Sequence, residues 1–228
     1  MKYNAHFVAL MVVSLLCSQA FAGGIGWEAE DAKVINPPMQ VFEDLPDASD
    51  GRYVSSPNAN QGSVEYEIEV PKSGKYYLWV RFRSQDTGSN SWLLQVDDPA
   101  SVVGNDDFAW DTIVPDLMPK KVGEEIGPLD EPGPAWEFNN QWWWLRLLER
   151  IDKQFNVLKI RVLELGVGKH TLYLWNREAN TRADAFYLSD TFDEQPVFPD
   201  EAPGLTPVDP QEKLAVTWGR LKDESRIH

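Results

Sequence analysis

The sequence predicts an all-β protein, an antiparallel β-sandwich (jelly roll) with a long loop insertion and an extended C-terminal tail. Between Trp27 and about Leu188, short segments of alternating apolar and polar residues are separated by turn residues. Little helical periodicity is present in this region. Many short strands at this spacing are typical of sandwiches and jelly rolls.

The clearest strand is SVEYEIEV, residues 63–70. Its apolar residues alternate with three glutamates, as in a strand with one buried and one exposed face. PKSG then predicts a turn, and KYYLWVRFR, residues 75–83, predicts the next strand. We therefore expect a hairpin in which basic residues of 75–83 face the glutamates of 63–70.

Further strands are predicted downstream, and QWWWLRLLERID predicts an amphipathic strand or short helix. The last two, which contain LYLWN and AFYLSD, are expected to form the final hairpin of the sandwich. The predicted strands are residues 91–97, 156–165, 170–176 and 184–190.

Residues 1–22 predict a secretory signal peptide. Lys2 provides the basic start, FVALMVVSLL the apolar run, and Ala20-Phe21-Ala22 the small-residue exit. Cleavage removes Cys17, the one cysteine of the chain. No later segment approaches ~18 uninterrupted apolar residues, so we expect no transmembrane segment after cleavage. The predicted location is secreted, periplasmic or at the cell surface.

Two regions depart from the strand pattern of the predicted domain, residues 23–191. Residues 99–139 are rich in proline, glycine and acids, and a structureless loop of about 40 residues is uncommon unless it has a function. We expect this insertion to lie over one end of the sandwich. Residues 192–228 predict a proline-rich acidic linker followed by a short C-terminal segment.

The final segment, residues 212–228, places Leu214, Trp218 and Leu221 on one face of a short amphipathic helix. Such a helix is too short to be stable alone. It is therefore expected to dock on the body or on a protein partner.

The net charge of −15 disfavours nucleic acid as a partner, because an acidic surface repels phosphate backbones. Acidic exported chains are compatible with calcium, which prefers clustered carboxylate and carbonyl oxygens. Solubility alone also explains acidity.

Nucleophilic hydrolysis is disfavoured by the residues present. After signal cleavage the chain has no cysteine, only His170 and His228, and no G-x-S-x-G motif. A second ordered histidine for a zinc site is missing from the pattern. A carboxylate pair could cleave glycosides, and a Tyr or Arg base could serve a lyase. Catalysis is therefore kept as an alternative to binding, although the sequence assigns no catalytic residues.

The stretch GWEAEDA places Glu28 and Glu30 two residues apart, so both side chains point to one face of a strand. Two adjacent carboxylates repel unless a cation or a basic residue lies between them. An exposed polar face is the other interpretation of this segment.

Four segments occur in an order that resembles a known family: EAEDA, DGRYVSS, VEYEIEVPKSGKYYLWVRFRSQD and GKHTLYLWNREANTRADAFYLSD. They resemble carbohydrate-binding modules of the family 6 and 35 type, within the galactose-binding-like jelly rolls. SGKYYLWVR is similar to the family's central strand, and NREANTRADAFYLSD to its closing segment. The resemblance covers about 27–98 and 140–191.

The resemblance implies a structural calcium ion where the first strand, an early loop and the last strand meet. The implied ligands are the carboxylates of Glu28, Glu30 and Asp184 and the backbone carbonyls around Gly51 and Arg52. Pairing of Asp184 with Arg182 or Arg177 is the alternative to metal binding.

The resemblance also implies a sugar site in loops at one end of the sandwich, where an aromatic ring stacks on the sugar and polar side chains bind hydroxyls. If QWWW is extended, Trp142 and Trp144 point to one side and Trp143 to the other. The closing loop reads REANT where the family has a glycine. The candidate sugar-binding residues are Asn90, Trp142, Trp143, Trp144, Arg177, Glu178, Asn180 and Arg182.

The sequence thus predicts an exported, non-catalytic protein that binds a polysaccharide or glycan and carries structural Ca²⁺. One alternative is a surface or matrix protein-interaction module on the same fold. The other is a polysaccharide lyase or glycoside hydrolase.

Overall fold

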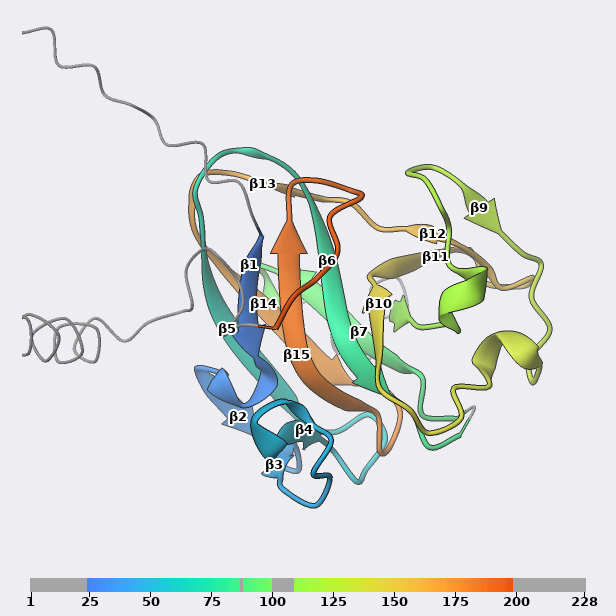
Figure 1. The fold of residues 1–228 in the computed structure, drawn as a ribbon, viewed down its shortest axis with the longest axis horizontal. Helices are drawn as coiled ribbons and strands as arrows, with labels where there is room; N and C mark the ends of the chain where they lie inside the picture. Colours follow the sequence, from blue (N-terminus) through green and yellow to red (C-terminus); the bar gives the residue numbers. More distant parts are fainter. Residues whose placement is uncertain (1–23, 87, 100–108, 199–228) are drawn as a thin grey trace, which may run out of the picture.

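Two antiparallel β-sheets face each other across an apolar core in the computed structural model, which describes residues 24–86, 88–99 and 109–198 (Figure 1). The all-β sandwich prediction is confirmed. The predicted signal peptide, residues 1–22, and the predicted helix at 212–228 lie outside the described residues. Among the described residues, no helix is long and apolar enough to cross a membrane.

The first sheet has seven strands and the second has eight. The first contains, in order, β10 (Trp143–Arg146), β6 (Gly74–Arg83), β15 (Arg182–Ser189), β4 (Tyr53–Ser55) and β3 (Gln40–Phe42), with β1 (Ile25–Glu28) paired to β15 and β13 (Leu163–Leu165) paired to β6. The second contains β2 (Val34–Asn36), β5 (Ser63–Val70), β14 (Gly168–Asn176), β7 (Ser91–Val96), β8 (Ala109–Asp111), β11 (Leu148–Asp152), β12 (Val157–Ile160) and β9 (Glu125–Ile126). The short 3₁₀ turns are η1 (Ala29–Asp31), η2 (Ser49–Gly51), η5 (Pro115–Leu117) and η6 (Pro134–Trp136).

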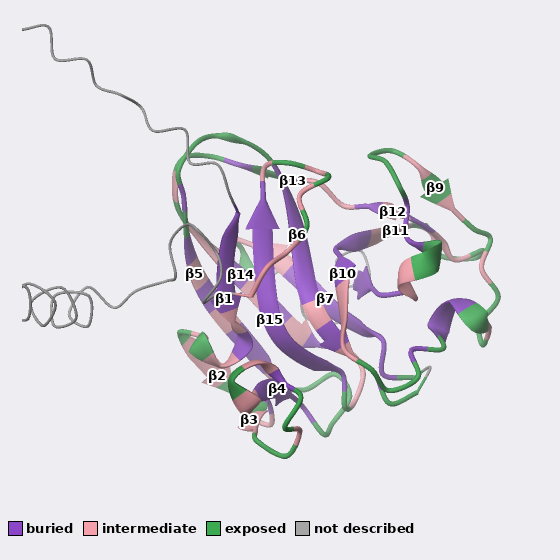
Figure 2. Ribbon diagram, in the orientation of Figure 1, coloured by how far each residue is buried: buried purple, intermediate pink, exposed green. Residues whose placement is uncertain are grey.

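Alternation along the strands decides which side chains fill the core. In β6, Leu78, Val80 and Phe82 are buried in the main apolar cluster. The residues that alternate with them, including Arg81 and Arg83, point to the outer face of the first sheet, as the period of two requires. Figure 2 shows β6 and β15 largely buried, whereas the connecting loops are exposed.

The predicted hairpins are wrong, although the strands that form them are present. β5 pairs with β14 and β2 in the second sheet, whereas β6 pairs with β15, β10 and β13 in the first. The connection between β5 and β6 therefore crosses from one sheet to the other. Glu67 forms ion pairs with Lys33 and Lys169, not with the basic residues of β6. β14 and β15 likewise lie in different sheets, so they do not form a hairpin.

Two predicted single segments are each divided between the sheets. The 156–165 segment forms β12 in the second sheet and β13 in the first, and the tryptophan-rich segment forms β10 in the first and β11 in the second. The breaks fall at Leu147 and at Arg161, and the Arg161 amide donates to the Leu147 carbonyl at 3.0 Å. The two crossings therefore lie side by side.

The described part of the insertion, 109–139, does not lie over an end of the sandwich as expected. It contributes β8 and β9 to the second sheet and forms a side lobe with β11 and β12, to the right in Figure 1. The lobe has its own apolar cluster, which includes Ile113, Trp136 and Leu158. A lobe that extends a sheet satisfies its backbone groups by strand pairing, which a bare loop cannot do.

One pH dependence follows from the start of β14, where His170 lies beside the residue that follows β7. His170 Nδ1 lies 2.6 Å from Asp97 Oδ2, and this bond, together with the Gly166 carbonyl, raises the pKa of His170 above 6.5. The stabilisation from the raised pKa is fully present below pH 6.5 and is lost as the pH rises through the folded-state value. We expect Asp97→Asn to lower the His170 pKa in an NMR titration. The stability difference between wild type and variant is then expected to shrink from mildly acidic to alkaline pH, and an unchanged His170 pKa would contradict the assignment.

Candidate functional site

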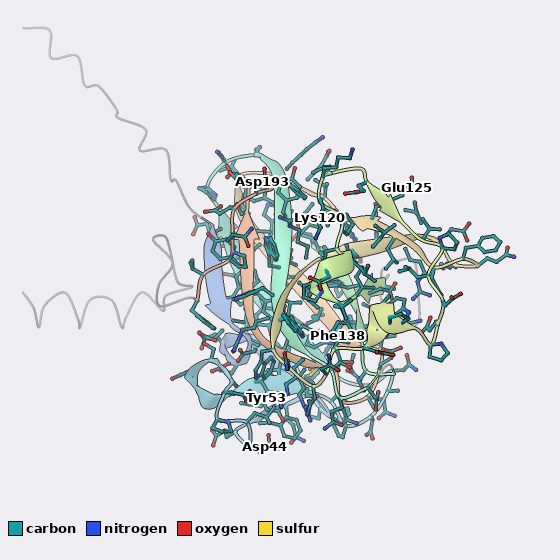
Figure 3. All side chains as sticks on the ribbon, turned by 45° about the vertical axis from the view of Figure 1, so that its right-hand side comes forward. Asp44, Tyr53, Lys120, Glu125, Phe138 and Asp193 are labelled. Atoms are coloured by element: carbon teal, nitrogen blue, oxygen red, sulfur yellow. The ribbon has the colours of Figure 1, made fainter. Side chains whose placement is uncertain are left out.

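The loops at one end of the sandwich bring the candidate binding residues together. β6 and β14 end there, and β7, β10 and β15 begin there, at the lower edge of Figure 1. We call this the loop end, made by the described residues 56–62, 84–86, 88–90, 139–142 and 177–181. Asp44 and Tyr53 lie at the same end in Figure 3. Most predicted sugar-binding residues are therefore at this end, but they divide into two clusters.

The first, outer cluster surrounds Trp142. The Trp142 ring meets the Tyr53 ring edge-on at 5.9 Å, and the guanidinium carbons of Arg81 and Arg83 lie 5.2 Å and 5.6 Å from its centroid. The guanidinium of Arg182 lies over Tyr53, 5.6 Å from its centroid. These contacts hold the half-buried indole between a ring and two cations.

Polar groups surround this aromatic centre. The Asn140 amide oxygen accepts from Arg83 Nε at 3.0 Å and from an Arg182 nitrogen at 3.3 Å. Asp47 accepts from Arg83 through both carboxylate oxygens, at 3.0 Å and 2.9 Å. Asn140 is exposed, and the Asp47 side chain is 61 % exposed. The outer cluster therefore presents fixed donors and acceptors next to an aromatic ring.

The three tryptophans divide as alternation predicts. Trp143 packs against the main core, and its indole nitrogen donates to the Phe138 carbonyl at 3.3 Å. Trp144 is on the outer face of the first sheet, with its ring 6.1 Å from that of Phe198. Within the outer cluster, Trp142 is therefore the tryptophan placed beside the exposed polar groups.

The second, inner cluster is mostly buried. Glu178 accepts from the backbone N–H of Asn90 at 2.7 Å and from Arg177 at 3.2 Å, and Arg177 also donates to the Ser91 hydroxyl at 2.6 Å. Burial raises the pKa of Glu178, while the Asn90 amide and Arg177 oppose that shift. These contacts brace the loops against each other.

The closing loop turns without the family glycine. Asn180 adopts φ 62°, in the left-handed region that asparagine tolerates better than most residues, and its amide donates to the Ser56 carbonyl at 2.8 Å. Asn180 is exposed. REANT therefore makes the tight turn with asparagine at the left-handed position.

The predicted metal ligands approach one another around η2. The Ser49 amide donates to Asp184 Oδ1 at 2.8 Å, and the Ser49 hydroxyl donates to Glu28 Oε1 at 2.9 Å. Asp50 and Gly51 adopt φ 48° and 72°, which bends the backbone back toward this point. One serine thus joins a carboxylate of β1 to a carboxylate of β15.

Two guanidinium groups neutralise part of this acidic cluster. Asp184 pairs with Arg81, and neither Arg177 nor Arg182 is its ion-pair partner. Arg52 Nε lies 3.1 Å from Glu30 Oε1, so Arg52 approaches the cluster through its side chain. Three carboxylates therefore share two guanidinium partners in this region.

The remaining carboxylate oxygens are poorly satisfied. Glu28 Oε2 and Glu30 Oε2 are buried without a hydrogen bond, and Glu30 Oε1, also without one, has only its ion pair with Arg52. The Glu30 side chain is 2 % exposed. Burial raises the pKa of Glu28 to about 7, with Glu30 and Asp184 adding repulsion, and burial raises that of Asp184 to about 7 against the opposing effect of Arg81. Within the described ranges, no three His, Cys, Asp or Glu side chains form a cluster already arranged to hold a metal ion. The unsatisfied oxygens nevertheless fit a cation that takes carboxylate ligands.

The sequence interpretation missed six residues of the outer cluster: Asp44, Asp47, Tyr53, Arg81, Arg83 and Asn140. Alternation along β6 already placed both arginines on the outer face, so this signal was available. The partners of these arginines come from loops distant in sequence, and no local pattern predicts them.

The fold and the loop end together define an antiparallel β-sandwich with polar and aromatic loops gathered at one end. No family model matches the chain, and no curated protein matches its sequence. Its fold is similar to a family 35 carbohydrate-binding module from Clostridium thermocellum, with 16 % identity, a TM-score of 0.48, and coverage of 75 % of this chain and 100 % of that one. It is also similar to the C-terminal family 6 module of LamC, a marine laminarinase from Zobellia galactanivorans, with 14 % identity, a TM-score of 0.44, and coverage of 73 % and 98 %.

A third similar structure is a β-(1,4)-mannanase from Podospora anserina that carries a family 35 module, with 14 % identity and a TM-score of 0.48. The match covers 76 % of this chain but only 29 % of the mannanase. Modules of families 35 and 6 are therefore among the solved structures that this chain is similar to, as the sequence resemblance led us to expect.

The buried pair of Arg81 and Asp184 makes a stability prediction. Arg81→Met is expected to cost about 3–5 kcal/mol of unfolding free energy, because it leaves a buried carboxylate without its cation. Arg81→Met with Asp184→Asn is expected to cost less than Arg81→Met alone. Denaturant unfolding measures both, with Lys33→Met as the control for an exposed pair worth less than about 1 kcal/mol. A loss in Arg81→Met no larger than that of the control would contradict the prediction.

Proposed function

We propose that this chain is an exported, non-catalytic carbohydrate-binding protein. The observation that carries the proposal is the outer cluster, where Trp142 lies beside Asn140, Arg83 and Asp47 at the loop end. Sugars present an apolar C–H face, which stacks on an aromatic ring, and hydroxyl groups, which bind amide, carboxylate and guanidinium groups. The outer cluster offers both kinds of contact in one place.

Binding is favoured over cleavage by how the acids of this cluster are engaged. Asp47 is held by Arg83, and Asp44 accepts from the Tyr53 hydroxyl at 2.6 Å. A cleaving carboxylate pair needs one protonated acid and one free base or nucleophile. Acids fixed by a cation and a hydroxyl are better suited to orienting a ligand.

The proposal includes a structural calcium ion at the acidic cluster. Glu28, Glu30 and Asp184 would hold it, with backbone carbonyls around Gly51 and Arg52. When bound, calcium would supply positive charge to the buried carboxylate oxygens that lack hydrogen bonds. These residues come from β1, from η1, from η2 and the residue that follows it, and from β15. The ion would therefore tie the first and last strands to the early loop.

Export to the periplasm, the cell surface or the medium is part of the proposal and rests on the signal-peptide pattern at residues 1–22. A protein partner through residues 212–228 is a separate proposal. Its support is the apolar face formed by Leu214, Trp218 and Leu221 in the sequence.

Glycan binding is tested on an array and by affinity gels with the mature protein in calcium. Trp142→Ala is expected to weaken binding at least about tenfold, because the stacking ring is lost. Phe155→Ala is the matched control, since Phe155 is an aromatic residue of the side lobe with 51 % exposure. Circular dichroism establishes that both variants are folded.

The absence of binding to any neutral or acidic polysaccharide would overturn the proposed function. Equal loss in Trp142→Ala and Phe155→Ala would instead place the sugar away from the outer cluster.

The calcium proposal predicts that EDTA lowers the melting temperature by several degrees, because saturating ligand stabilises the folded state. Glu30→Ala and Asp184→Ala are expected to remove this sensitivity to EDTA. Glu69→Ala, an exposed glutamate on β5, is expected to keep it. A wild-type melting temperature that is identical with and without chelator would count against the site.

A further inference from the structure

A segment at the end of the described chain crosses the outer face of the first sheet. After β15 the chain turns at the top of Figure 1 and returns in front of β15 and β6. We call residues 190–198 the C-terminal strap. The strap contains no strand and therefore does not extend the sheet by backbone pairing.

Phe192 of the strap closes a stack of three groups. The Arg146 guanidinium carbon lies 3.9 Å from the Phe192 centroid and 4.3 Å from that of Trp79. Arg146 also donates to the Phe192 carbonyl at 2.8 Å, and the Phe192 ring meets Tyr77 edge-on at 5.3 Å. The sheet thus holds an aromatic ring and a backbone carbonyl of the strap on one arginine.

Phe198 makes the second anchor of the strap. The Arg81 guanidinium carbon lies 4.9 Å from its centroid, and the Trp144 ring is 6.1 Å away. Between the anchors, Glu194 accepts from the Tyr187 hydroxyl at 2.9 Å and from the Ser189 hydroxyl. At the start of the strap, Asp190 pairs with Lys72. An acidic, aromatic segment therefore lies on a cationic, aromatic face.

The strap satisfies this face incompletely. Arg146 is 8 % exposed and forms no ion pair among the described residues, and burial lowers its pKa. Arg146 Nε and Trp79 Nε1 are buried without a hydrogen bond. Arg146 is stacked between two rings and bonded to one carbonyl, but it has no carboxylate in ion-pair contact among the described residues. A partner that places a carboxylate on this buried cation would satisfy it better.

The strap is also partly exposed and is held without strand pairing. Thr191, Asp193 and Gln195 are exposed, and the other residues of the strap are only half-buried. Its side-chain contacts must offset the conformational entropy that the segment loses, without the backbone ladder that holds β15. Such segments open locally far more often than the strands beneath them.

From these contacts we infer that the outer face of the first sheet, formed by Tyr77, Trp79, Arg81, Trp144 and Arg146, is a recognition site for extended acidic peptides that carry aromatic residues. The C-terminal strap is its occupant within the chain. A partner peptide binds when the strap leaves. This site is separate from the outer cluster at the loop end, although Arg81 contacts both.

The test uses the full mature chain and a fluorescent peptide with the sequence of residues 190–198, DTFDEQPVF. Phe192→Ser with Phe198→Ser removes both anchors and releases the strap. The released variant is expected to bind the peptide at least about tenfold more tightly than wild type, in which the tethered strap competes at high effective concentration. Adding Arg146→Met to the released variant is expected to abolish binding. A peptide with serine at both phenylalanine positions is the matched control.

A released variant that is folded by circular dichroism but does not bind the peptide would overturn the inference. Peptide binding that persists after Arg146→Met is added to the released variant would also overturn the inference. Binding of an oligouronate to the Arg146 face, without binding of the peptide, would overturn it as well. If the released variant fails to fold, hydrogen exchange on the wild-type chain tests whether the strap leaves the face. Fast exchange in the strap relative to β15 supports a displaceable occupant, and exchange as slow as that of β15 overturns it.

Discussion

The ion pair between Arg81 and Asp184 is the interaction on which the rest of the functional surface depends. Asp184 is fully buried at a bulge in β15, where the register to β6 shifts between Ala183 and Ala185. A bulge re-aims a side chain that regular pairing would place elsewhere. The carboxylate thereby reaches both Arg81 and the Ser49 amide. A buried carboxylate of this kind is tolerable only with a cation and hydrogen bonds around it.

Arg81 in turn connects three regions that are distant in sequence. Its guanidinium pairs with Asp184 in the acidic cluster, lies over Trp142 in the outer cluster, and lies over Phe198 in the strap. It also donates to the Asp47 carbonyl at 3.2 Å, in the loop that follows β3. The planar guanidinium group of arginine can stack on rings through both faces while its N–H groups donate hydrogen bonds in the plane, which the ammonium group of lysine cannot do. A shift of this one side chain therefore reaches the candidate metal site, the candidate sugar site and the strap together.

Local pattern predicted the strands well and their partners poorly. Period-two alternation in 63–70 predicts which face of that strand is buried, and the structure confirms that face. The same alternation and turn residues are compatible with a hairpin and with a connection that crosses between sheets. Local pattern does not discriminate between the two, and both hairpin predictions were wrong. The site shows the same division. Trp142 was found from its segment, whereas the pairing of Arg81 with a carboxylate 103 residues away has no local signal. The 156–165 run stayed apolar through a change of sheet because both cores accept apolar residues.

The side lobe illustrates what continuity of a sheet implies for modularity. β8 lies between β7 and β11, so the insertion supplies the strand that joins the lobe to the original sandwich. Excision of the insertion would leave β7 on one side and β11 on the other with unpaired backbone donors and acceptors. Exposed sheet edges of this kind are templates for association between chains. The insertion is thus an integral part of the second sheet. Its deletion would expose strand edges that are now paired, and these edges could pair with other chains.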